Sequence, residues 1–143
     1  DGEGVKHLHQ VAGGSVKPAS HETVEAREHF IYQEGQAVFK WAVVKMAEAT
    51  EEILKRNNMT SQDISYLLPH QANMRIISAT GKRLELENEK VLVNIEKYGN
   101  TTSATIPMLM FENQHKFKKG DNLILTAFGA GFTWGAVLVK WAI

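Results

Sequence analysis

Residues 64–84 read ISYLLPHQANMRIISATGKRL, and this stretch decides the fold. Residues 64–68 form a mostly apolar run of the kind that a buried strand shows, and the run stops at Pro69. Apolar or small side chains then recur at every fourth position, which predicts a helix over residues 71–84. His70 therefore lies at a strand-to-helix junction, where open α/β sheets place their ligands.

The same order of strand, loop and helix follows a second time. Residues 91–95 predict a short strand, and the Thr and Ser side chains at 101–103 offer N-caps for a helix that reaches about residue 116. Upstream, residues 36–56 carry apolar side chains at helical spacing and predict a long helix, while residues 5–11 alternate loosely and predict a short strand.

The chain ends in a predicted strand pair. Residues 123–128 and 132–141 form two apolar runs, and the small residues 129–131 make a tight connection between them. Strands that alternate with helices and close on a pair predict an α/β fold, with a mixed β-sheet covered by helices. A length of 143 residues is that of one domain, so we expect residues 1–143 to fold as one unit.

The composition excludes several classes of protein. Lys and Arg number 16 and Asp and Glu number 16, so the formal net charge is +0, and the general cationic attraction of nucleic-acid binders is absent. Hydrophobic residues make up 43% of the chain, which is typical of a globular protein. No stretch approaches the roughly 20 apolar residues that span a bilayer, and the N-terminus has no signal-peptide core, so we expect a cytoplasmic protein without a membrane span.

Cysteine is absent from the chain, which excludes disulfides, thiolate metal sites and a cysteine nucleophile within it. His7 and His9 fall on one face of a predicted strand, but no third ligand lies near them, so no metal site is predicted. The chain begins without Met in a polar segment, which suggests a piece of something longer.

Three loops at the ends of predicted strands carry the residues that could perform chemistry: 69–73, 98–103 and 128–135. The imidazole of His70 and the amide of Asn100 are neutral donors that can bind an oxyanion, although His70 could also act as a general acid or base. The glycine-rich connection leaves a backbone N–H open to a carbonyl oxygen. Each feature alone is more typical of a structural residue.

Three strings carry a resemblance: LLPHQANMRIISATGKRL at 67–84, YGNTTSATIP at 98–107 and AFGAGFTWGAVLV at 127–139. In this order and spacing they resemble the C-terminal half of the β-ketoacyl-acyl-carrier-protein synthase III family, whose fold is a thiolase-like pair of similar halves. The resemblance implies that residues 1–143 are one such half. The pairing of His with Asn narrows the choice to this branch and the chalcone-synthase-like one.

The resemblance implies roles for individual residues. His70 matches the catalytic histidine and Asn100 the catalytic asparagine, which together stabilise the enolate formed when a malonyl thioester loses carbon dioxide. Ala130 falls where a backbone amide completes the oxyanion hole. Positions that line the tunnel for the pantetheine arm of the substrate are Gly35, Phe39 and Asn73. The basic surface that receives the acidic carrier protein is implied at Lys40, Arg75, Lys82 and Arg83.

The implied enzyme is an acyltransferase that condenses an acyl-CoA primer with malonyl carrier protein by decarboxylative Claisen chemistry, the first step of fatty-acid synthesis. Its partners are the acyl carrier protein, acyl-CoA and a second copy in a homodimer, and it uses no cofactor besides its substrates. The cysteine nucleophile belongs to an N-terminal half, so this chain alone is expected to be inactive. Two alternatives stay open: a starter-unit synthase of secondary metabolism, and a noncatalytic module that binds a carrier protein.

Overall fold

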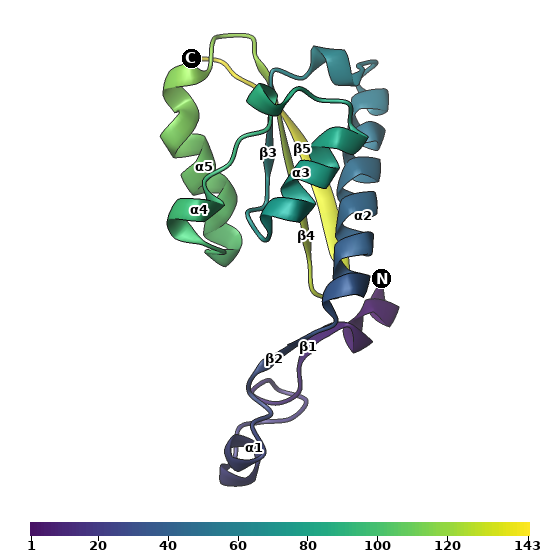
Figure 1. The fold of residues 1–143 in the computed structure, drawn as a ribbon, viewed down its shortest axis with the longest axis vertical. Coiled ribbons are helices and arrows are strands. Elements are labelled where there is room, and N and C mark those ends of the chain that lie inside the picture. Colours follow the sequence, from purple (N-terminus) through teal and green to yellow (C-terminus); the bar gives the residue numbers. More distant parts are fainter. The chain divides into compact units, whose positions relative to one another are not determined.

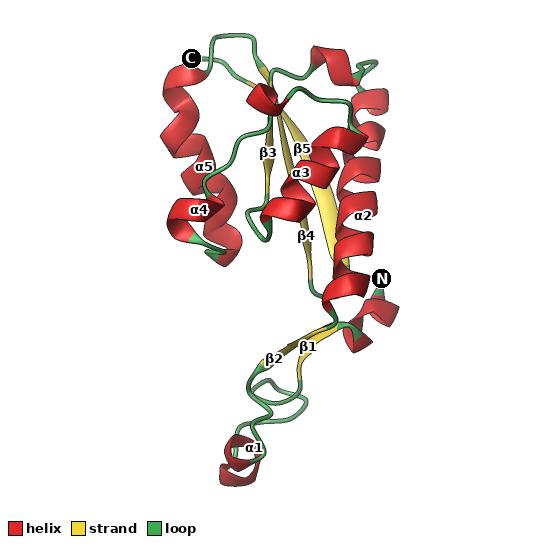
Figure 2. Cartoon of the chain, in the orientation of Figure 1, coloured by secondary structure: helices red, strands yellow, loops and turns green.

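The computed structural model describes residues 1–143 as an α/β chain that divides into two compact units. Unit 1 comprises Asp1–Lys40 and Gly129–Thr133, and unit 2 comprises Trp41–Phe128 and Trp134–Ile143. Figure 1 labels the helices and strands along the chain, and Figure 2 separates them by type.

The α-helices are α1 (His21–Glu25), α2 (Gly35–Arg56), α3 (Met74–Arg83), α4 (Ile95–Tyr98) and α5 (Thr105–Asn113). The strands are β1 (Leu8–Gln10), β2 (Ile31–Gln33), β3 (Tyr66–Pro69), β4 (Asn122–Gly129) and β5 (Thr133–Lys140). Short 3-10 turns lie at Gly2–Lys6, Ser61–Asp63, Asn88–Lys90, Thr102–Ala104 and Gln114–Lys116. None of the helices combines the length and the apolar character needed to cross a membrane.

The main sheet has the strand order β3-β4-β5. Strand β3 runs parallel to β4, with Tyr66 opposite Leu123 and Pro69 opposite Thr126. The short connection at residues 130–132 returns the chain from β4 into its neighbour β5, which makes the sheet mixed. The predicted α/β class and the terminal strand pair are thereby confirmed.

Helices cover both faces of this sheet (Figure 1). Leu67 and Leu68 are adjacent in β3, so their side chains point to opposite faces, and each belongs to a different apolar cluster. The first cluster, which includes side chains of α2, comprises Ala47, Leu54, Ile64, Leu67, Leu84 and Ile124. The second, which includes a side chain of α5, comprises Leu68, Leu92, Leu109, Phe117 and Leu123. Burial on both sides explains why the strand is a nearly continuous apolar run.

The long predicted helix over 36–56 is confirmed as α2, but four other predictions need correction. The Thr and Ser side chains at 101–103 do not cap α5, because that helix begins at Thr105 after the N-cap Ala104, which makes no side-chain hydrogen bond. The helix predicted over 71–84 begins later, at Met74, because the Asn73 side chain accepts a hydrogen bond from the backbone N–H of Arg75 at 2.8 Å and caps it. The strand predicted over 91–95 was wrong. A single bridge from Val91 to Leu67 is all the pairing that forms there before α4 begins.

The strand predicted over 5–11 is also shorter than expected. Residues Gly2–Lys6 form a 3-10 helix whose N-cap is Asp1, so only Leu8–Gln10 is left to form β1. Its antiparallel partner β2 and the helix α1 were not predicted. Both are short, and every residue of β2 is exposed, so neither leaves a periodic apolar pattern in the sequence.

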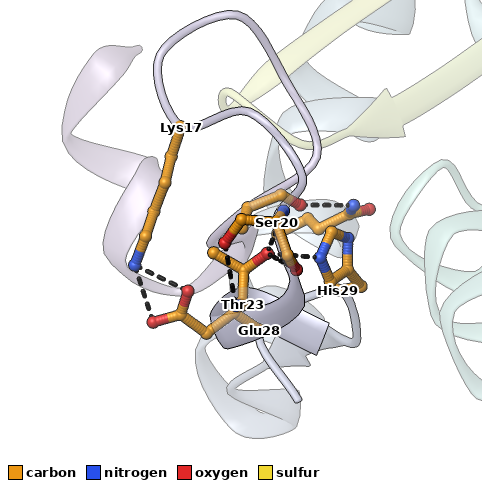
Figure 3. Close-up of polar contacts among 7 residues, drawn as sticks. Lys17, Ser20, Thr23, Glu28 and His29 are labelled. Atoms are coloured by element: carbon orange, nitrogen blue, oxygen red, sulfur yellow. Dashed lines mark hydrogen bonds and ion pairs between the residues drawn. The ribbon is translucent and has the colours of Figure 1, made fainter. Parts of the chain in front are cut away.

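Polar contacts hold the α1 region of unit 1 together (Figure 3). Ser20 and Thr23 form a capping box at the start of α1. The Thr23 hydroxyl also contacts His29 Nε2 at 2.9 Å, and Lys17 pairs with Glu28 at 2.6 Å. Side-chain hydrogen bonds therefore add to the backbone bonds that hold this segment, such as the one from the Ala12 N–H to the Glu28 carbonyl.

Leu67→Ala tests the two-sided packing of the sheet. Leu67 is fully buried in β3, and its loss should lower the free energy of unfolding by about 2–5 kcal/mol. The matched variant Phe111→Ala removes a side chain that is 73% exposed on α5 and should change it by no more than about 0.5 kcal/mol. Urea denaturation of both variants measures the difference, and equal effects would contradict the assigned core.

Candidate active site

His70 lies directly after β3, at the end of the parallel strand pair. Its backbone N–H donates to the carbonyl oxygen of Thr126 at 2.8 Å and continues the ladder between β3 and β4. The imidazole is half-buried, and this burial lowers its pKa below the ordinary value of 6.5, because a desolvated ring disfavours the charged form. The ring is therefore neutral at pH 7.

The ring is oriented by a hydroxyl group on α5. His70 Nδ1 lies 2.6 Å from Thr105 Oγ1, and Thr105 is buried at the start of that helix. The same oxygen also lies 3.0 Å from the carbonyl oxygen of Thr102, to which it can donate. Because Nδ1 is occupied by the protein, Nε2 is the ring nitrogen that remains for a ligand.

Asn100 is exposed in the loop after α4, and its side-chain amide has a defined orientation. The backbone N–H of Thr102 donates to Asn100 Oδ1 at 2.9 Å. Since a backbone N–H can only donate, the accepting atom must be the amide oxygen. The Asn100 Nδ2 group is thereby the part of the side chain that can donate to a ligand.

Thr102 links the two predicted residues. Its N–H holds Asn100, and its carbonyl oxygen lies 3.0 Å from the Thr105 hydroxyl, which in turn contacts His70. The φ angle of Thr102 is +53°, a left-handed conformation that a β-branched residue seldom adopts. Such strain is maintained only where surrounding bonds impose it, and it is concentrated at functional sites. The structure therefore brings His70 and Asn100 into one hydrogen-bonded group.

Gln71 ties the same loop to the segment that leads to Asn100. Its side chain is fully buried, donates through Nε2 to the Pro69 carbonyl at 2.8 Å and accepts through Oε1 from the N–H groups of Asn94 (3.0 Å) and Ile95 (3.1 Å). These bonds explain why residues 91–95 are not a strand: two of their N–H groups pair with a side chain. Sequence reasoning missed Gln71, whose only local signal is a polar residue next to an apolar run.

A carboxylate on α5 fixes α4 in the same way. Glu112 accepts hydrogen bonds from the Tyr98 hydroxyl at 2.6 Å and from Asn94 Nδ2 at 2.8 Å, and Lys97 Nζ lies 3.8 Å away. The bonds from Tyr98 and then Asn94 lower the pKa of the Glu112 carboxyl, so it stays ionised. The loop that carries Asn100 is thus anchored on the side of α4.

The remaining predicted site residues fall into both units. Unit 2 also holds Asn73, whose side chain caps α3, so the structure gives it a structural role and its predicted contact with the pantetheine arm stays a prediction. Unit 1 holds Gly35 at the start of α2, where it is exposed, and the half-buried Phe39 later in that helix. Unit 1 also holds the connection that contains Ala130.

The connection around Ala130 is held in place by residues near the N-terminus. Phe132 is 1% exposed, and its carbonyl oxygen accepts from the amino group of Asp1 at 2.7 Å. A Cβ atom on Gly4 would lie 2.4 Å from Phe132 Cγ, so only glycine fits there. The ring of His7 stacks on Phe132 with centroids 6.0 Å apart. Close packing therefore fixes the backbone next to Ala130, whose role as an oxyanion donor stays a prediction.

Three of the four predicted basic residues gather on one helix. Arg75, Lys82 and Arg83 are exposed on α3, whose buried side faces the core through Ile76 and Ile77. Arg75 and Lys82 are seven positions apart and so share a face, and the helix contains no acidic residue. The fourth, Lys40, is exposed on the α2 segment of unit 1.

The buried ring of His70 makes stability depend on pH. The folded chain binds a proton at His70 less readily than the unfolded chain does, so stability is full above pH 6.5 and is lost as the pH falls from there to the lowered pKa. The wild type should therefore lose stability relative to His70→Gln below pH 6.5. Urea denaturation of both proteins between about pH 7.5 and 5 measures this. If the stability of both proteins changes with pH in the same way, the lowered pKa of His70 is contradicted.

Comparison with known proteins relates this site to a family. Residues 54–141 match the family model described as 3-oxoacyl-[acyl-carrier-protein (ACP)] synthase III C terminal. The β-ketoacyl-[acyl-carrier-protein] synthase III of Porphyromonas gingivalis is 59% identical over 142 residues, which cover 99% of this chain and 42% of the relative. The chain thus spans less than half the length of such curated relatives.

Solved structures share the fold. The 3-oxoacyl-(acyl carrier protein) synthase III from Pseudomonas aeruginosa PAO1 matches with a TM-score of 0.86 and 34% identity, over 100% of this chain and 43% of that one. The priming β-ketosynthase of the R1128 polyketide pathway matches with a TM-score of 0.77 and 29% identity, over 98% of this chain and 42% of that one. These matches confirm the resemblance that the three sequence strings predicted.

Proposed function

The chain belongs to the C-terminal family of 3-oxoacyl-[acyl-carrier-protein] synthase III, and from this premise we propose that it is the catalytic C-terminal half of a condensing enzyme. The enzyme would join an acyl-CoA primer to malonyl carrier protein and so start fatty-acid synthesis, as a cytoplasmic homodimer that needs no cofactor besides its substrates. The observation that carries the proposal is the hydrogen-bonded group that leaves His70 Nε2 and Asn100 Nδ2 available to a ligand.

The chemistry needs two neutral donors. When the malonyl thioester loses carbon dioxide, the bond to the carboxyl carbon breaks and its electron pair passes to an enolate, whose charge lies mainly on the thioester oxygen. His70 and Asn100 would donate to that oxygen without changing their own charge, which suits the lowered pKa of His70. The enolate carbon then attacks the acyl group held as a thioester, and the thiolate leaves.

The acyl thioester requires a nucleophile that this chain does not contain. Because the chain has no cysteine, we propose that residues 1–143 form the C-terminal half of a longer enzyme whose N-terminal half supplies it. In that enzyme the backbone amide of Ala130 would stabilise the oxyanion of the acyl group. The denaturing mass of the native polypeptide tests the arrangement: about twice 16.0 kDa supports it, and 16.0 kDa without a cysteine-bearing partner contradicts it.

The basic side of α3 fits a carrier protein. It follows the loop of His70 in the chain, and it presents Arg75, Lys82 and Arg83 without an intervening acidic residue. An acidic carrier would be attracted to such a surface, and the pantetheine arm that it carries would then reach a site on the neighbouring loop. We further propose that Lys40 contacts the carrier and that Gly35, Phe39 and Asn73 contact the arm.

Asn100→Ala tests the catalytic assignment in the complete enzyme. Removing one oxyanion donor should lower the rate of condensation by at least about 10²–10³-fold, while acyl loading of the cysteine stays unchanged. The matched variant Asn57→Ala, at the exposed end of α2, should leave both steps unchanged. Product formation from malonyl carrier protein and mass spectrometry of the acylated enzyme measure the two steps. Condensation near the wild-type rate would contradict the role of Asn100.

A double charge reversal tests the docking surface. Arg75→Glu combined with Lys82→Glu should weaken carrier-protein binding, and the loss should be smaller at high salt because exposed charges are screened. Lys118→Glu combined with Lys119→Glu makes the same change of charge in an exposed turn and should leave binding unchanged. Titration of the carrier protein by calorimetry at two salt concentrations compares them. If both pairs weaken binding equally, the net charge of the protein causes the effect, and the proposed docking surface on α3 is contradicted.

Two alternatives have support of their own. The match to a polyketide priming synthase favours a starter-unit synthase of secondary metabolism, and assays with primers of different length separate it from the main proposal. The second alternative, a noncatalytic module that binds a carrier protein, also accommodates a chain without a cysteine of its own. That module would bind the carrier but would not condense, even when a cysteine-bearing half is present.

A further inference from the structure

The Thr105 hydroxyl faces two possible acceptors. Thr105 is 2% exposed, and its Oγ1 atom lies 2.6 Å from His70 Nδ1 and 3.0 Å from the carbonyl oxygen of Thr102. A hydroxyl carries one hydrogen, so it can donate fully to only one of them. If it donates to Thr102, then His70 Nδ1 must carry the proton. If it donates to Nδ1, the proton of the neutral ring must be on Nε2.

The pairing of the Thr102 carbonyl leaves the Thr105 hydroxyl free to donate to His70. The Thr102 carbonyl already accepts the backbone N–H of Thr105, so it is paired without the hydroxyl. Thr105 Oγ1 is the hydrogen-bond partner that the structure gives Nδ1, and a hydroxyl that the carbonyl does not require can donate to this nitrogen. The contact to Nδ1 is the shorter of the two, which makes it the stronger bond whichever atom supplies the hydrogen.

We propose that Thr105 is a positioning residue for His70: its hydroxyl donates to Nδ1 and so keeps the proton of the neutral ring on Nε2. The effect of this tautomer on catalysis rests on the proposed function. An enolate oxygen needs a donor, and the other tautomer would present the lone pair of Nε2 to it. Thr105 thus selects the form of His70 that can stabilise negative charge.

The surrounding structure restricts the orientation of the Thr105 hydroxyl. Thr105 is β-branched and begins α5, so its χ1 angle has few options. The carbonyl that receives its backbone N–H belongs to Thr102, whose strained φ of +53° also presents its own N–H to Asn100. The orientation of the His70 ring and that of the Asn100 amide are therefore set by the same short segment.

Nitrogen NMR of the chain with ¹⁵N-labelled histidine tests the tautomer directly. The resonances of His70 are identified by their loss in His70→Gln. The wild type and Thr105→Ser should show a protonated Nε2 and an unprotonated, hydrogen-bonded Nδ1. In Thr105→Val, which keeps the shape and removes the hydroxyl, the Nδ1 resonance should move to the position of a nitrogen without a hydrogen bond. A protonated Nδ1 in the wild type, or identical spectra for wild type and Thr105→Val, would overturn the proposal.

Kinetics of the complete enzyme provide the second readout. Thr105→Val should lower kcat for condensation by at least about tenfold with little change in KM, and Thr105→Ser should recover most of the loss. If Thr105→Val does not fold, the wild-type spectrum alone decides the tautomer. The two proposals fail separately: an Nε2-protonated ring in an enzyme that does not condense overturns the proposed function, whereas Asn100-dependent condensation with a protonated Nδ1 overturns only this inference.

Discussion

The buried side-chain amide of Gln71 is the group on which the arrangement of the candidate site depends. It bonds one carbonyl in the loop of His70 and two N–H groups at the start of α4. Without this amide, the backbone groups that it bonds would be buried and unpaired, and each would cost about 1–3 kcal/mol of stability. The Gln71 side chain therefore joins the loop after β3 to the segment that leads to Asn100. The surrounding residues bury this side chain completely.

The main sheet fixes the position of His70 through strand β3. Strand β3 is short, yet it supplies Leu67 to one apolar cluster and Leu68 to the other, so layers on both sides hold it. Its last residue pairs with Thr126 of β4, and the His70 N–H adds the next bond. A side chain placed one residue beyond a doubly buried strand has little freedom to move, which suits the role of preorganised donor that we propose for His70.

Sequence patterns predicted the elements whose signal is local and missed those whose cause is distant. The long helix α2 and the strand pair β4-β5 were found because their apolar periods run over many residues. The strand predicted over 91–95 failed because Gln71, 23 residues away, takes up the N–H of Asn94. His70 and Asn100 stood out through their motifs. Thr105 did not, because the role that we propose for it comes from a contact across 35 residues of sequence.

Gly4 is a residue without side-chain chemistry whose small size the backbone next to Ala130 requires. A methyl group at this position would act as a wedge against Phe132 and would push on the backbone next to Ala130, the residue that we propose as an oxyanion donor. Glycine carries no reactive group and lies at the opposite end of the sequence. In a mutational scan it would nevertheless behave like a member of the active site, and an annotation of functional residues by chemical type alone would leave it out.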